Sequence, residues 1–257
     1  MSIVECKNIK KHFPILRGYR REKVGIVKAV DDVSLEIKKG ETFGLVGESG
    51  CGKTTIGKII LGIIKPDSGR IILSAQRPQV IFQDPYNSLD PKMRVREILA
   101  EGLVLQDRRQ GTSLGFARDR RDKIQEILDL VKLPKSSVTK YPHEFSGGER
   151  QRIAIGRAVL TEPEFIVCDE PVSSLDVTIQ LEILKLLKNI QKRFSITYLF
   201  ISHDLRVVKF MSDRVAVMKE GKIIEEGPTS RIYSNPERSY TKLLLSSILN
   251  IYPKAYL

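Results

Sequence analysis

The sequence predicts an α/β fold with a mainly parallel sheet, an antiparallel β subdomain and an inserted helical subdomain. Short apolar runs alternate with helical patterns in both halves of the 257-residue chain, as expected of parallel strands that are joined by helices. Two long strand-like segments precede the first helical pattern, and a charge-rich helical stretch interrupts the alternation at residues 95–131.

The chain begins with strands. Residues 3–9 and 24–37 have strand patterns, and the basic segment 14–23, which contains glycine and proline, is expected to be a long hairpin loop. An apolar strand at 42–46 leads through a glycine-rich turn into a helix at 53–64. Two further strand patterns occur at 70–73 and 79–82.

A second alternating region follows the helical stretch. Its predicted elements are a helix from Ser146, a strand at 165–168, a helix at 177–193, a strand at 197–201 and a hairpin of strands 214–218 and 222–226. In the tail, Asn235 is predicted to cap a helix whose first residue is Pro236, because this order of residues is typical of a helix start.

The composition restricts the class of protein. The formal net charge is +12, with denser basic patches at 17–23 and 108–123, and such a charge suits nucleic acid, an anionic membrane surface or phosphate ligands. No stretch approaches the roughly 18 apolar residues of a membrane span, and the first residues lack the apolar run of a secretory signal. We therefore expect the protein to stay in the cytoplasm, with any link to a membrane made through a partner.

The cysteines do not indicate a disulfide framework or a zinc site. The chain has three cysteines, Cys6, Cys51 and Cys168, and they show no CxxC spacing. A disulfide framework is indicated by an even number of cysteines, and a zinc site by CxxC-type spacing. A reducing compartment fits this cysteine usage.

Residues 47–55 form the strongest single motif, G-x-x-x-x-G-K-[ST], between a predicted strand and a predicted helix. Glycines let backbone N–H groups curl around a phosphate without Cβ clashes, and the helix that follows presents its positive end to the same anion. Lys53 would contact the β- and γ-phosphates of ATP, and the Thr54 hydroxyl would ligate Mg²⁺. The predicted ATP-binding residues of this loop are Gly47, Glu48, Ser49, Gly50, Cys51, Gly52, Lys53, Thr54 and Thr55.

An acidic pair follows the apolar strand at 165–168. Asp169 would hold Mg²⁺ through its water shell, and Glu170 would orient and deprotonate the attacking water. An apolar run that ends in two acids is also typical of a surface turn. The glycine-rich loop elsewhere in the chain favours the catalytic interpretation.

The segment FSGGERQ, residues 145–151, resembles the LSGGQ signature of ABC ATPases, a family of P-loop NTPases. Other segments resemble further landmarks of this family in the expected order, and the resemblance covers nearly the whole chain. Gln83 resembles the Q-loop glutamine, and Ser174 and Asp176 resemble the D-loop. His203 resembles the switch histidine, although a single histidine after an apolar strand is more often structural. Phe13 stands where the family has the aromatic residue that stacks on adenine.

The resemblance assigns roles to these residues. It implies that Glu170, His203, Lys53 and Gln83 serve catalysis. It also implies that Mg²⁺ is held by Thr54, Gln83 and Asp169.

The signature segment implies a dimer. Ser146 is predicted to start a helix, which leaves backbone N–H groups and a hydroxyl facing outward. In the family, the signature of one subunit covers the γ-phosphate that the other subunit binds. The residues implied to act on the partner's ATP are Ser146, Gly147, Gly148 and Glu149, of which Glu149 replaces the family's usual glutamine without an expected loss of activity.

Longer strings resemble the peptide/nickel importer branch of the family. They are FQDPYNSLDPKM at 82–93, YPHEFSGGERQRIAIGRAV at 141–159 and DEPVSSLDVTIQ at 169–180. The tail NPERSYTKLL, 235–244, resembles that branch's ending, although a capped terminal helix accounts for it equally well.

The branch implies ATP-driven import of di- or oligopeptides, with import of nickel or a metal chelate as the alternative. The implied partners are a second ABC ATPase subunit, with a heterodimer favoured, two transmembrane permease subunits and, indirectly, a solute-binding protein. No nucleic-acid partner is implied.

The resemblance also predicts the organisation of the chain. Residues 1–83 would form the antiparallel β subdomain and the first part of the ATPase core, and 84–145 the helical insertion. Residues 146–228 would complete the core, and 229–257 would form a helical tail.

Only 30 positions separate Lys53 from Gln83, fewer than in relatives, so a hairpin and a helix are expected to be missing. Some relatives carry a cysteine cluster near the C-terminus. No cysteine follows Cys168, so an iron–sulfur cluster is not expected, nor is zinc.

Two other functions remain open at this point. One is a non-transport ABC ATPase that acts on nucleic acid or ribosomes, which the net charge permits. The absence of a second cassette, heptad repeats or zinc ligands from the sequence speaks against it. The other is a nucleotide-binding regulatory module without turnover, against which the presence of both Lys53 and Glu170 speaks.

Overall fold

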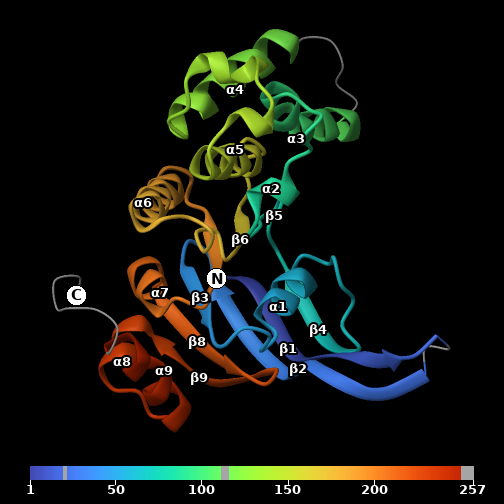
Figure 1. Cartoon of the computed structure of the whole chain (residues 1–257), viewed down its shortest axis with the longest axis vertical. Helices are drawn as coiled ribbons and strands as arrows, with labels where there is room; N and C mark the ends of the chain where they lie inside the picture. The colour runs from blue at the N-terminus through green and yellow to red at the C-terminus, as the bar shows by residue number, and fades with distance from the viewer. Residues whose placement is uncertain (20–21, 111–115, 250–257) are drawn as a thin grey trace. The chain divides into compact units, whose positions relative to one another are not determined.

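The computed structural model of the chain describes residues 1–19, 22–110 and 116–249. These form two compact units, one made of Met1–Ala75 with Thr197–Leu257 and the other of Gln76–Ile196 (Figure 1). Strands and helices alternate within them, which confirms the predicted α/β class. The predicted division into four functional segments stays a prediction.

The first unit contains a three-stranded antiparallel sheet of order β2-β1-β4. Its strands are β1 Ser2–Arg17, β2 Glu22–Lys38 and β4 Ser68–Leu73. This sheet is the predicted antiparallel β subdomain. The apolar residues of β1 and β2 near the N-terminus, such as Val4, Ile9 and Ile37, are fully buried.

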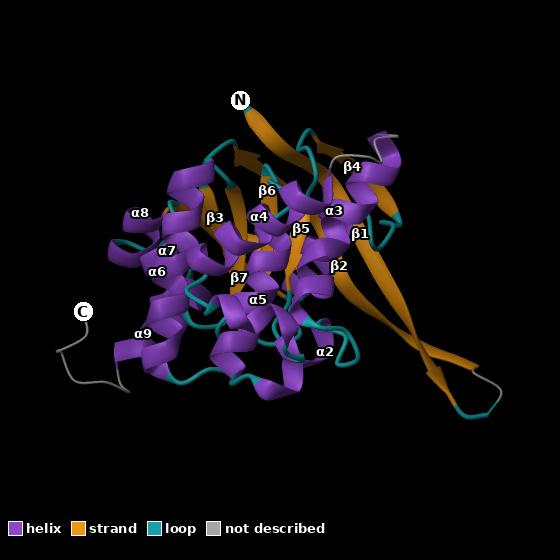
Figure 2. Ribbon diagram, turned by 90° about the horizontal axis from the view of Figure 1, so that it is seen from above, coloured by secondary structure: helices purple, strands orange, loops and turns teal. Residues whose placement is uncertain are grey.

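The predicted loop at 14–23 is wrong, because β1 and β2 continue through most of it as a paired hairpin (Figure 2). Pro14 pairs with Ile26 in this hairpin, beyond the last residue of β1 that pairs with β4, which is Lys10. One edge of β1 is therefore open at Pro14. A proline, which has no N–H to donate, is tolerated at an open strand edge.

The first unit also contains strands of a parallel sheet. β3 Thr42–Val46 pairs in parallel with both β7 Thr197–Ser202 and β8 Arg214–Lys219, and β9 Lys222–Pro228 pairs antiparallel with β8. Every residue of β3 and β7 is buried, as expected of strands in a covered parallel sheet. The helices of this unit are α1 Lys53–Ile60, α7 Leu205–Met211, α8 Thr229–Ser234 and α9 Ser239–Leu249.

The second unit combines two parallel strands with the helical insertion. β5 Gln79–Ile81 pairs with β6 Phe165–Asp169. The helices are α2 Pro85–Ser88, α3 Val95–Gln110, α4 Phe116–Leu130, α5 Gly147–Val159 and α6 Val177–Phe194, with 3₁₀ turns at Lys135–Thr139 and Pro142–Glu144. α3, α4 and α5 pack on one another (Figure 1).

A small residue permits this helix packing. A Cβ atom added to Gly156 of α5 would lie 2.9 Å from Ile127 of α4 and 3.3 Å from Leu99 of α3. The three helices can therefore approach closely around Gly156, and the apolar residues beside it, including Leu128 and Ile153, are fully buried.

A short link joins β4 to β5. Only residues 74–78 separate these two strands, and they contain no helix. The Ser74 amide donates to the Ile3 carbonyl, and the Gln76 amide donates to the Glu164 carboxylate. The chain therefore passes directly from the antiparallel sheet to β5, as the short spacing in the sequence predicts.

The predicted start of the tail helix is wrong. Asn235 is the C-cap of α8, and the next helix, α9, begins at Ser239 rather than at Pro236. The backbone amides of Glu237 and Arg238 instead donate to the carboxylate of Glu225 in β9, at 2.9 and 3.1 Å. A side chain that is distant in sequence thus holds the segment before α9 out of the helix.

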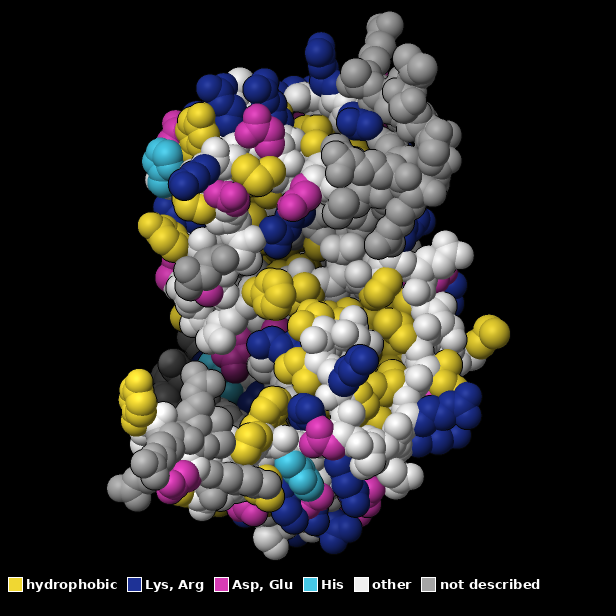
Figure 3. Space-filling view, turned by 90° about the vertical axis from the view of Figure 1, so that its right-hand side faces the viewer, with side chains coloured by type: hydrophobic (Ala, Val, Ile, Leu, Met, Phe, Trp, Pro, Cys, Tyr) yellow, Lys and Arg dark blue, Asp and Glu magenta, His cyan; other side chains and the backbone are white. Residues whose placement is uncertain are grey.

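The basic charge of the surface is dispersed in the view that Figure 3 shows, where Lys and Arg side chains occur in several separate groups. The two predicted basic patches, 17–23 and 108–123, lie largely outside the residues whose side chains are described. Among the described helices, none is both long enough and apolar enough to cross a membrane.

Candidate nucleotide-binding site

The glycine-rich loop at 47–55 connects β3 to α1 in the first unit. Gly47 and Gly52 have positive φ values of 152° and 110°. A Cβ atom at Gly47 would lie 2.1 Å from the Met218 carbonyl oxygen, and one at Gly52 would lie 1.9 Å from the Ala29 carbonyl oxygen. Only glycine fits at these two positions, because main-chain atoms of β8 and β2 touch the loop.

Lys53 lies inside this loop. Its side chain is nearly buried, with 5% of its surface exposed, and its Nζ donates to the carbonyl oxygens of Gly47 and Glu48, both at 2.8 Å. α1 begins at Lys53, and no side chain caps its start. An uncapped helix start attracts anions.

The turn between β8 and β9 supports the loop from outside. The Gly221 amide donates to the Cys51 carbonyl at 3.0 Å, and the Gly221 carbonyl accepts from the Asp31 amide at 2.8 Å. These contacts involve only backbone atoms, so no side-chain pattern in the sequence indicated them.

His203 is brought to the same edge of the sheet as the loop. β3 and β7 end in register, with Val46 opposite Ser202, so Gly47 and His203 follow neighbouring strand ends. The His203 side chain is exposed. The next residue, Asp204, caps α7 by accepting from the Arg206 amide at 2.9 Å. This arrangement supports the predicted role of His203 near a bound phosphate.

Phe13 lies in the extended part of the β1–β2 hairpin. It pairs with Val27, and both apolar side chains are partly exposed, Phe13 at 38% and Val27 at 49%. Val27 is two residues along β2 from Ala29, which contacts Gly52, a separation of about 7 Å in a strand. An exposed aromatic ring at this distance from a phosphate loop is suited to stacking on a nucleotide base.

In the second unit, Gln83 and the acidic pair follow two paired strands. Ile81 of β5 lies opposite Cys168 of β6, so Gln83 and Glu170 each come two residues after this pair. Asp169 is buried, with 8% of its surface exposed, and Gln83 is exposed. Parallel strands end at one edge of a sheet, and this edge carries all three residues.

Glu170 has an unusual backbone conformation, with a φ of +50°. The Ser173 amide and hydroxyl donate to the Glu170 carbonyl at 3.3 and 3.1 Å, which holds the turn after β6. A non-glycine residue in the left-handed region costs energy and is frequent at functional sites. The strained turn is therefore consistent with a catalytic residue at this position.

The signature segment forms the start of α5, as predicted. The Ser146 hydroxyl accepts from the Glu149 amide at 3.3 Å, and the Glu149 carboxylate accepts from the Ser146 amide and hydroxyl, both at 2.8 Å. This is a capping box. The Ser146 amide and hydroxyl lower the pKa of the Glu149 carboxyl group, so this residue carries its charge at neutral pH.

The D-loop residues lie beside the signature. Asp176 caps α6 by accepting from the Ile179 amide at 3.1 Å, and Ser174 is exposed. A Cβ atom at Gly148 would lie 2.6 Å from the Ile179 side chain. Gly148 therefore allows the start of α5 to approach the start of α6.

The residues predicted to hold Mg²⁺ carry oxygen donors, the type of ligand that this ion takes in proteins. They offer one hydroxyl, Thr54, in the first unit and one amide and one carboxylate, Gln83 and Asp169, in the second. In the described part of the chain, no cluster of three or more His, Cys, Asp or Glu could hold a metal by itself. Mg²⁺ commonly takes one or two protein ligands together with substrate phosphates and water.

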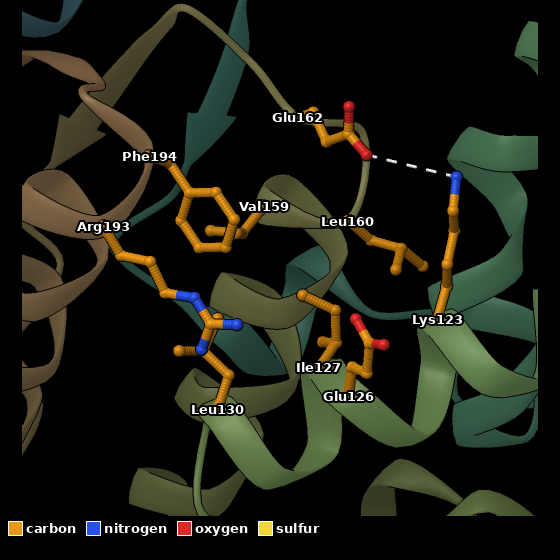
Figure 4. A pocket seen from close by; sticks show the side chains of 9 residues that line it. All are labelled: Lys123, Glu126, Ile127, Leu130, Val159, Leu160, Glu162, Arg193 and Phe194. Atoms are coloured by element: carbon orange, nitrogen blue, oxygen red, sulfur yellow. Dashed lines mark ion pairs between the residues drawn. The ribbon is translucent and has the colours of Figure 1, made fainter.

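A shallow pocket of about 100 Å³ opens at the C-terminal end of α5 (Figure 4). Its lining is Lys123, Glu126, Ile127, Leu130, Val159, Leu160, Glu162, Arg193 and Phe194. Lys123 and Glu162 form an ion pair across it, at 4.0 Å. The signature lies at the first residue of α5, about 20 Å from the last at 1.5 Å per residue, so this pocket is separate from the signature.

A glycine loop around a buried lysine, a histidine at the adjacent strand end and a capped Ser-Gly-Gly segment together define an ATP-binding cassette. The ABC transporter family model matches residues 30–173. The chain belongs to this family, which confirms the predicted resemblance.

Peptide transport proteins are among the relatives that the chain resembles in sequence. It is 45% identical to the oligopeptide transport ATP-binding protein OppF of Bacillus subtilis, over 96% of this chain and 82% of that protein. It is also 45% identical to the dipeptide transport ATP-binding protein DppF of Lactococcus lactis, over 96% of this chain and 81% of the relative. These names confirm the predicted branch.

A similar solved structure is the dimeric post-hydrolysis state of the ATP-binding cassette MJ0796 bound to ADP and phosphate. It has a TM-score of 0.74 and 27% identity, and the match covers 88% of this chain and 98% of that one. The fold of the chain is therefore that of a cassette which binds and hydrolyses ATP.

Proposed function

We propose that this chain is the ATP-hydrolysing subunit of an importer for di- or oligopeptides. The observation that carries the proposal is the position of the Lys53 ammonium, held by two carbonyls inside a loop where only glycine fits at Gly47 and Gly52. Such a loop is built for the β- and γ-phosphates of ATP. The names of the relatives OppF and DppF supply the peptide substrate class.

The first unit would bind the nucleotide. Phe13 would stack on adenine, the amides at the start of α1 would hold the phosphates, and His203 would contact the γ-phosphate. Thr54 would contribute to Mg²⁺ binding. Mg²⁺ bound there would neutralise part of the negative charge of the phosphates.

The second unit would supply the water-activating groups. Glu170 would accept a proton from the attacking water, which its carboxylate can do when ionised. Gln83 and Asp169 would complete the binding of Mg²⁺. The strained turn at Glu170 would keep its side chain in one position relative to β6.

A second subunit would complete each site. The hydroxyl of Ser146 and the amides of Gly147 and Gly148 lie at the start of α5, where a helix attracts anions. They would contact the γ-phosphate on a partner ATPase, and the partner's signature would act here in return. ATP would therefore hold a head-to-tail dimer together, and hydrolysis would release it.

The partners of the whole assembly would be two transmembrane permease subunits, a second ATPase subunit and a solute-binding protein. The helical insertion, 84–145, would contact the permeases on the cytoplasmic side of the inner membrane. Gln83 stands immediately before this insertion, so it would couple hydrolysis to movement of the permeases.

The test uses Glu170→Gln, which keeps the size of the side chain and removes the base. We expect this variant to bind MgATP, to lose at least about 100-fold in turnover, and to form a stable dimer with its natural partner ATPase or with itself. Lys53→Met is the matched control, because it should lose ATP binding as well. A Glu170→Gln chain that stays monomeric with saturating MgATP in both mixtures would contradict the dimer mechanism.

The substrate class has its own experiment. The assembled transporter is reconstituted in vesicles with its solute-binding protein, and ATP hydrolysis is measured with a set of di- to hexapeptides and with Ni²⁺ chelates. Stimulation by peptides supports the proposal, and stimulation by the nickel chelates alone supports the alternative. Co-purification with ribosomes or DNA in place of permeases would contradict both.

A further inference from the structure

The C-terminal tail touches the phosphate loop. Tyr240 of α9 places its ring 4.8 Å from the Nζ of Lys219 at the end of β8. Its hydroxyl lies beside Glu48 and Cys51 of the loop. A residue from the last described helix thus reaches the second residue of the ATP-binding motif.

Hydrogen bonds and an ion pair hold the segment before α9, and with it Tyr240, in place. The Glu225 carboxylate accepts from the amides of Glu237 and Arg238, immediately before α9. Thr241, the neighbour of Tyr240, is 1% exposed. Arg231 forms an ion pair with Glu237 and also donates to the Glu226 carbonyl at 2.6 Å.

The Tyr240 hydroxyl oxygen is buried and has no hydrogen-bond partner among the described residues. Burial and the adjacent Glu48 carboxylate raise the pKa of Tyr240 to about 12, so the hydroxyl keeps its proton at neutral pH. A buried donor without an acceptor is costly, and such a group calls for an explanation. The carboxylate of Glu48, which acts on the pKa of this hydroxyl, is a charged acceptor beside it.

The carboxylate of Glu48 is unfavourable for ATP binding. Its carbonyl oxygen helps to hold Lys53, but its side chain is exposed and carries a carboxylate within the phosphate loop. A carboxylate that turns toward the phosphates repels them. The loop therefore needs a group that keeps this charge to one side.

We propose that Tyr240 is a positioning residue whose hydroxyl donates to the Glu48 carboxylate when ATP occupies the loop, and so holds this charge away from the phosphates. The inference rests on the proposed ATPase function and extends it, because the tail helix then sets the affinity of the loop for nucleotide. It also assigns a role to the tail segment NPERSYTKLL, 235–244.

The first measurement is the affinity of the full chain for a fluorescent ATP analogue with Mg²⁺. Tyr240→Phe keeps the ring and removes the hydroxyl, and we expect the Kd to rise about tenfold, with kcat in the complete transporter changed less than twofold. Tyr233→Phe is the matched control. It removes another buried tail hydroxyl, which donates to the Leu205 carbonyl, and should leave the Kd unchanged.

The second measurement separates charge positioning from packing. In a Glu48→Gln background there is no charge to hold, so adding Tyr240→Phe should change the Kd less than twofold. Glu48→Gln alone should bind the analogue at least as tightly as the unmodified chain, which tests the inference even if Tyr240→Phe folds poorly. Weaker binding by Glu48→Gln, or the same loss from Tyr240→Phe in both backgrounds, would overturn the inference.

The outcomes also distinguish the inference from the proposed function. If the unmodified chain binds and hydrolyses ATP and Tyr240→Phe matches it, only the role of Tyr240 is wrong. If the unmodified chain does not bind ATP, the proposed function itself fails.

Discussion

Glu170 combines a chemical role with a strained backbone. Its φ of +50° lies in the left-handed region, where a side chain with a Cβ atom costs about 1 kcal/mol or more relative to glycine. Glu162 has nearly the same φ, +51°, but lies on the surface after α5, where its carboxylate forms long ion pairs with Arg77 at 3.9 Å and Lys123 at 4.0 Å. Substitutions at these two residues can therefore distinguish the effect of backbone strain from the effect of the catalytic carboxylate.

We predict that Glu170→Gly raises the free energy of unfolding by about 0.5–1 kcal/mol, because it relieves this strain. Glu162→Gly should be stabilised by a similar amount. Urea unfolding measures both changes. Only Glu170→Gly should lose ATP hydrolysis, and a loss in both variants would show that the conformation rather than the carboxylate matters.

Glu149 places a negative charge at a site proposed to face the partner's γ-phosphate. The carboxylate is held by the Ser146 amide and hydroxyl, so it engages the hydroxyl that the partner's phosphate would need. A glutamine could keep the capping contact to the Ser146 amide without the charge.

We predict that Glu149→Gln lowers the MgATP concentration needed for half-maximal dimerisation by about threefold to tenfold, because the repulsion of one charge is removed. The effect should shrink as salt rises. Analytical ultracentrifugation at two ionic strengths measures it. Glu144→Gln, a charge change just outside the signature, is the control and should have little effect.

At the scale of elements, Glu225 connects β9 to the tail. Burial alone would raise its pKa, but the hydrogen bonds from the backbone amides of Glu237 and Arg238 outweigh burial and hold the pKa below its usual value. A carboxyl group with a lowered pKa stabilises the fold above its unfolded pKa, near 4.5, and this contribution is lost as the pH falls through the folded pKa.

We predict that Glu225→Gln lowers the free energy of unfolding by about 1 kcal/mol at pH 7, since a charge-assisted contact becomes neutral. The difference between the variant and the unmodified chain should close as the pH falls below about 4. Urea unfolding at pH 7 and pH 4 measures the two differences. A constant gap at both values would mean that ionisation of Glu225 does not stabilise the tail.

The elements themselves show what the sequence could predict. Buried parallel strands such as β3 and β6 follow from local apolar runs, and the glycine loop and the start of α5 follow from local motifs. The extended β1–β2 hairpin does not, because pairing between distant residues overrides a local proline signal. The start of α9 was missed for a similar reason, since Glu225 lies ten residues before Asn235.

The site shows the same division. Side chains with a characteristic chemistry, such as Lys53, Asp169 and Ser146, could be identified from the sequence. The supporting contacts could not, because the Ala29 and Met218 carbonyls are backbone atoms that every residue type supplies. Tyr240 lies within the tail segment NPERSYTKLL, 235–244, but its proximity to Glu48 depends on how α9 packs.

At the scale of the whole molecule, each unit contains a buried cysteine that can report its unfolding. Cys6 lies in β1 of the first unit and Cys168 in β6 of the second, and both thiols are buried. Burial raises the pKa of Cys6 to about 12, and burial also raises the pKa of Cys168. Neither thiol is therefore reactive while its unit is folded.

We predict that a maleimide reagent at pH 7.5 modifies Cys6 and Cys168 only at the rate at which their units open. Mass spectrometry of digested samples, taken along a urea series, measures the two rates separately. Equal midpoints would mean that the units unfold together, and an earlier midpoint for one thiol would identify the less stable unit. Fast labelling of either residue without urea would contradict its burial.

The two carbonyl groups that border the phosphate loop have an evolutionary consequence. Because the Ala29 and Met218 oxygens are part of the main chain, no substitution at those positions can make room for a side chain at Gly52 or Gly47. A lineage that lost either glycine could recover only by reverting the same codon. A suppressor screen started from Gly52→Ala should therefore return true revertants and no second-site rescue.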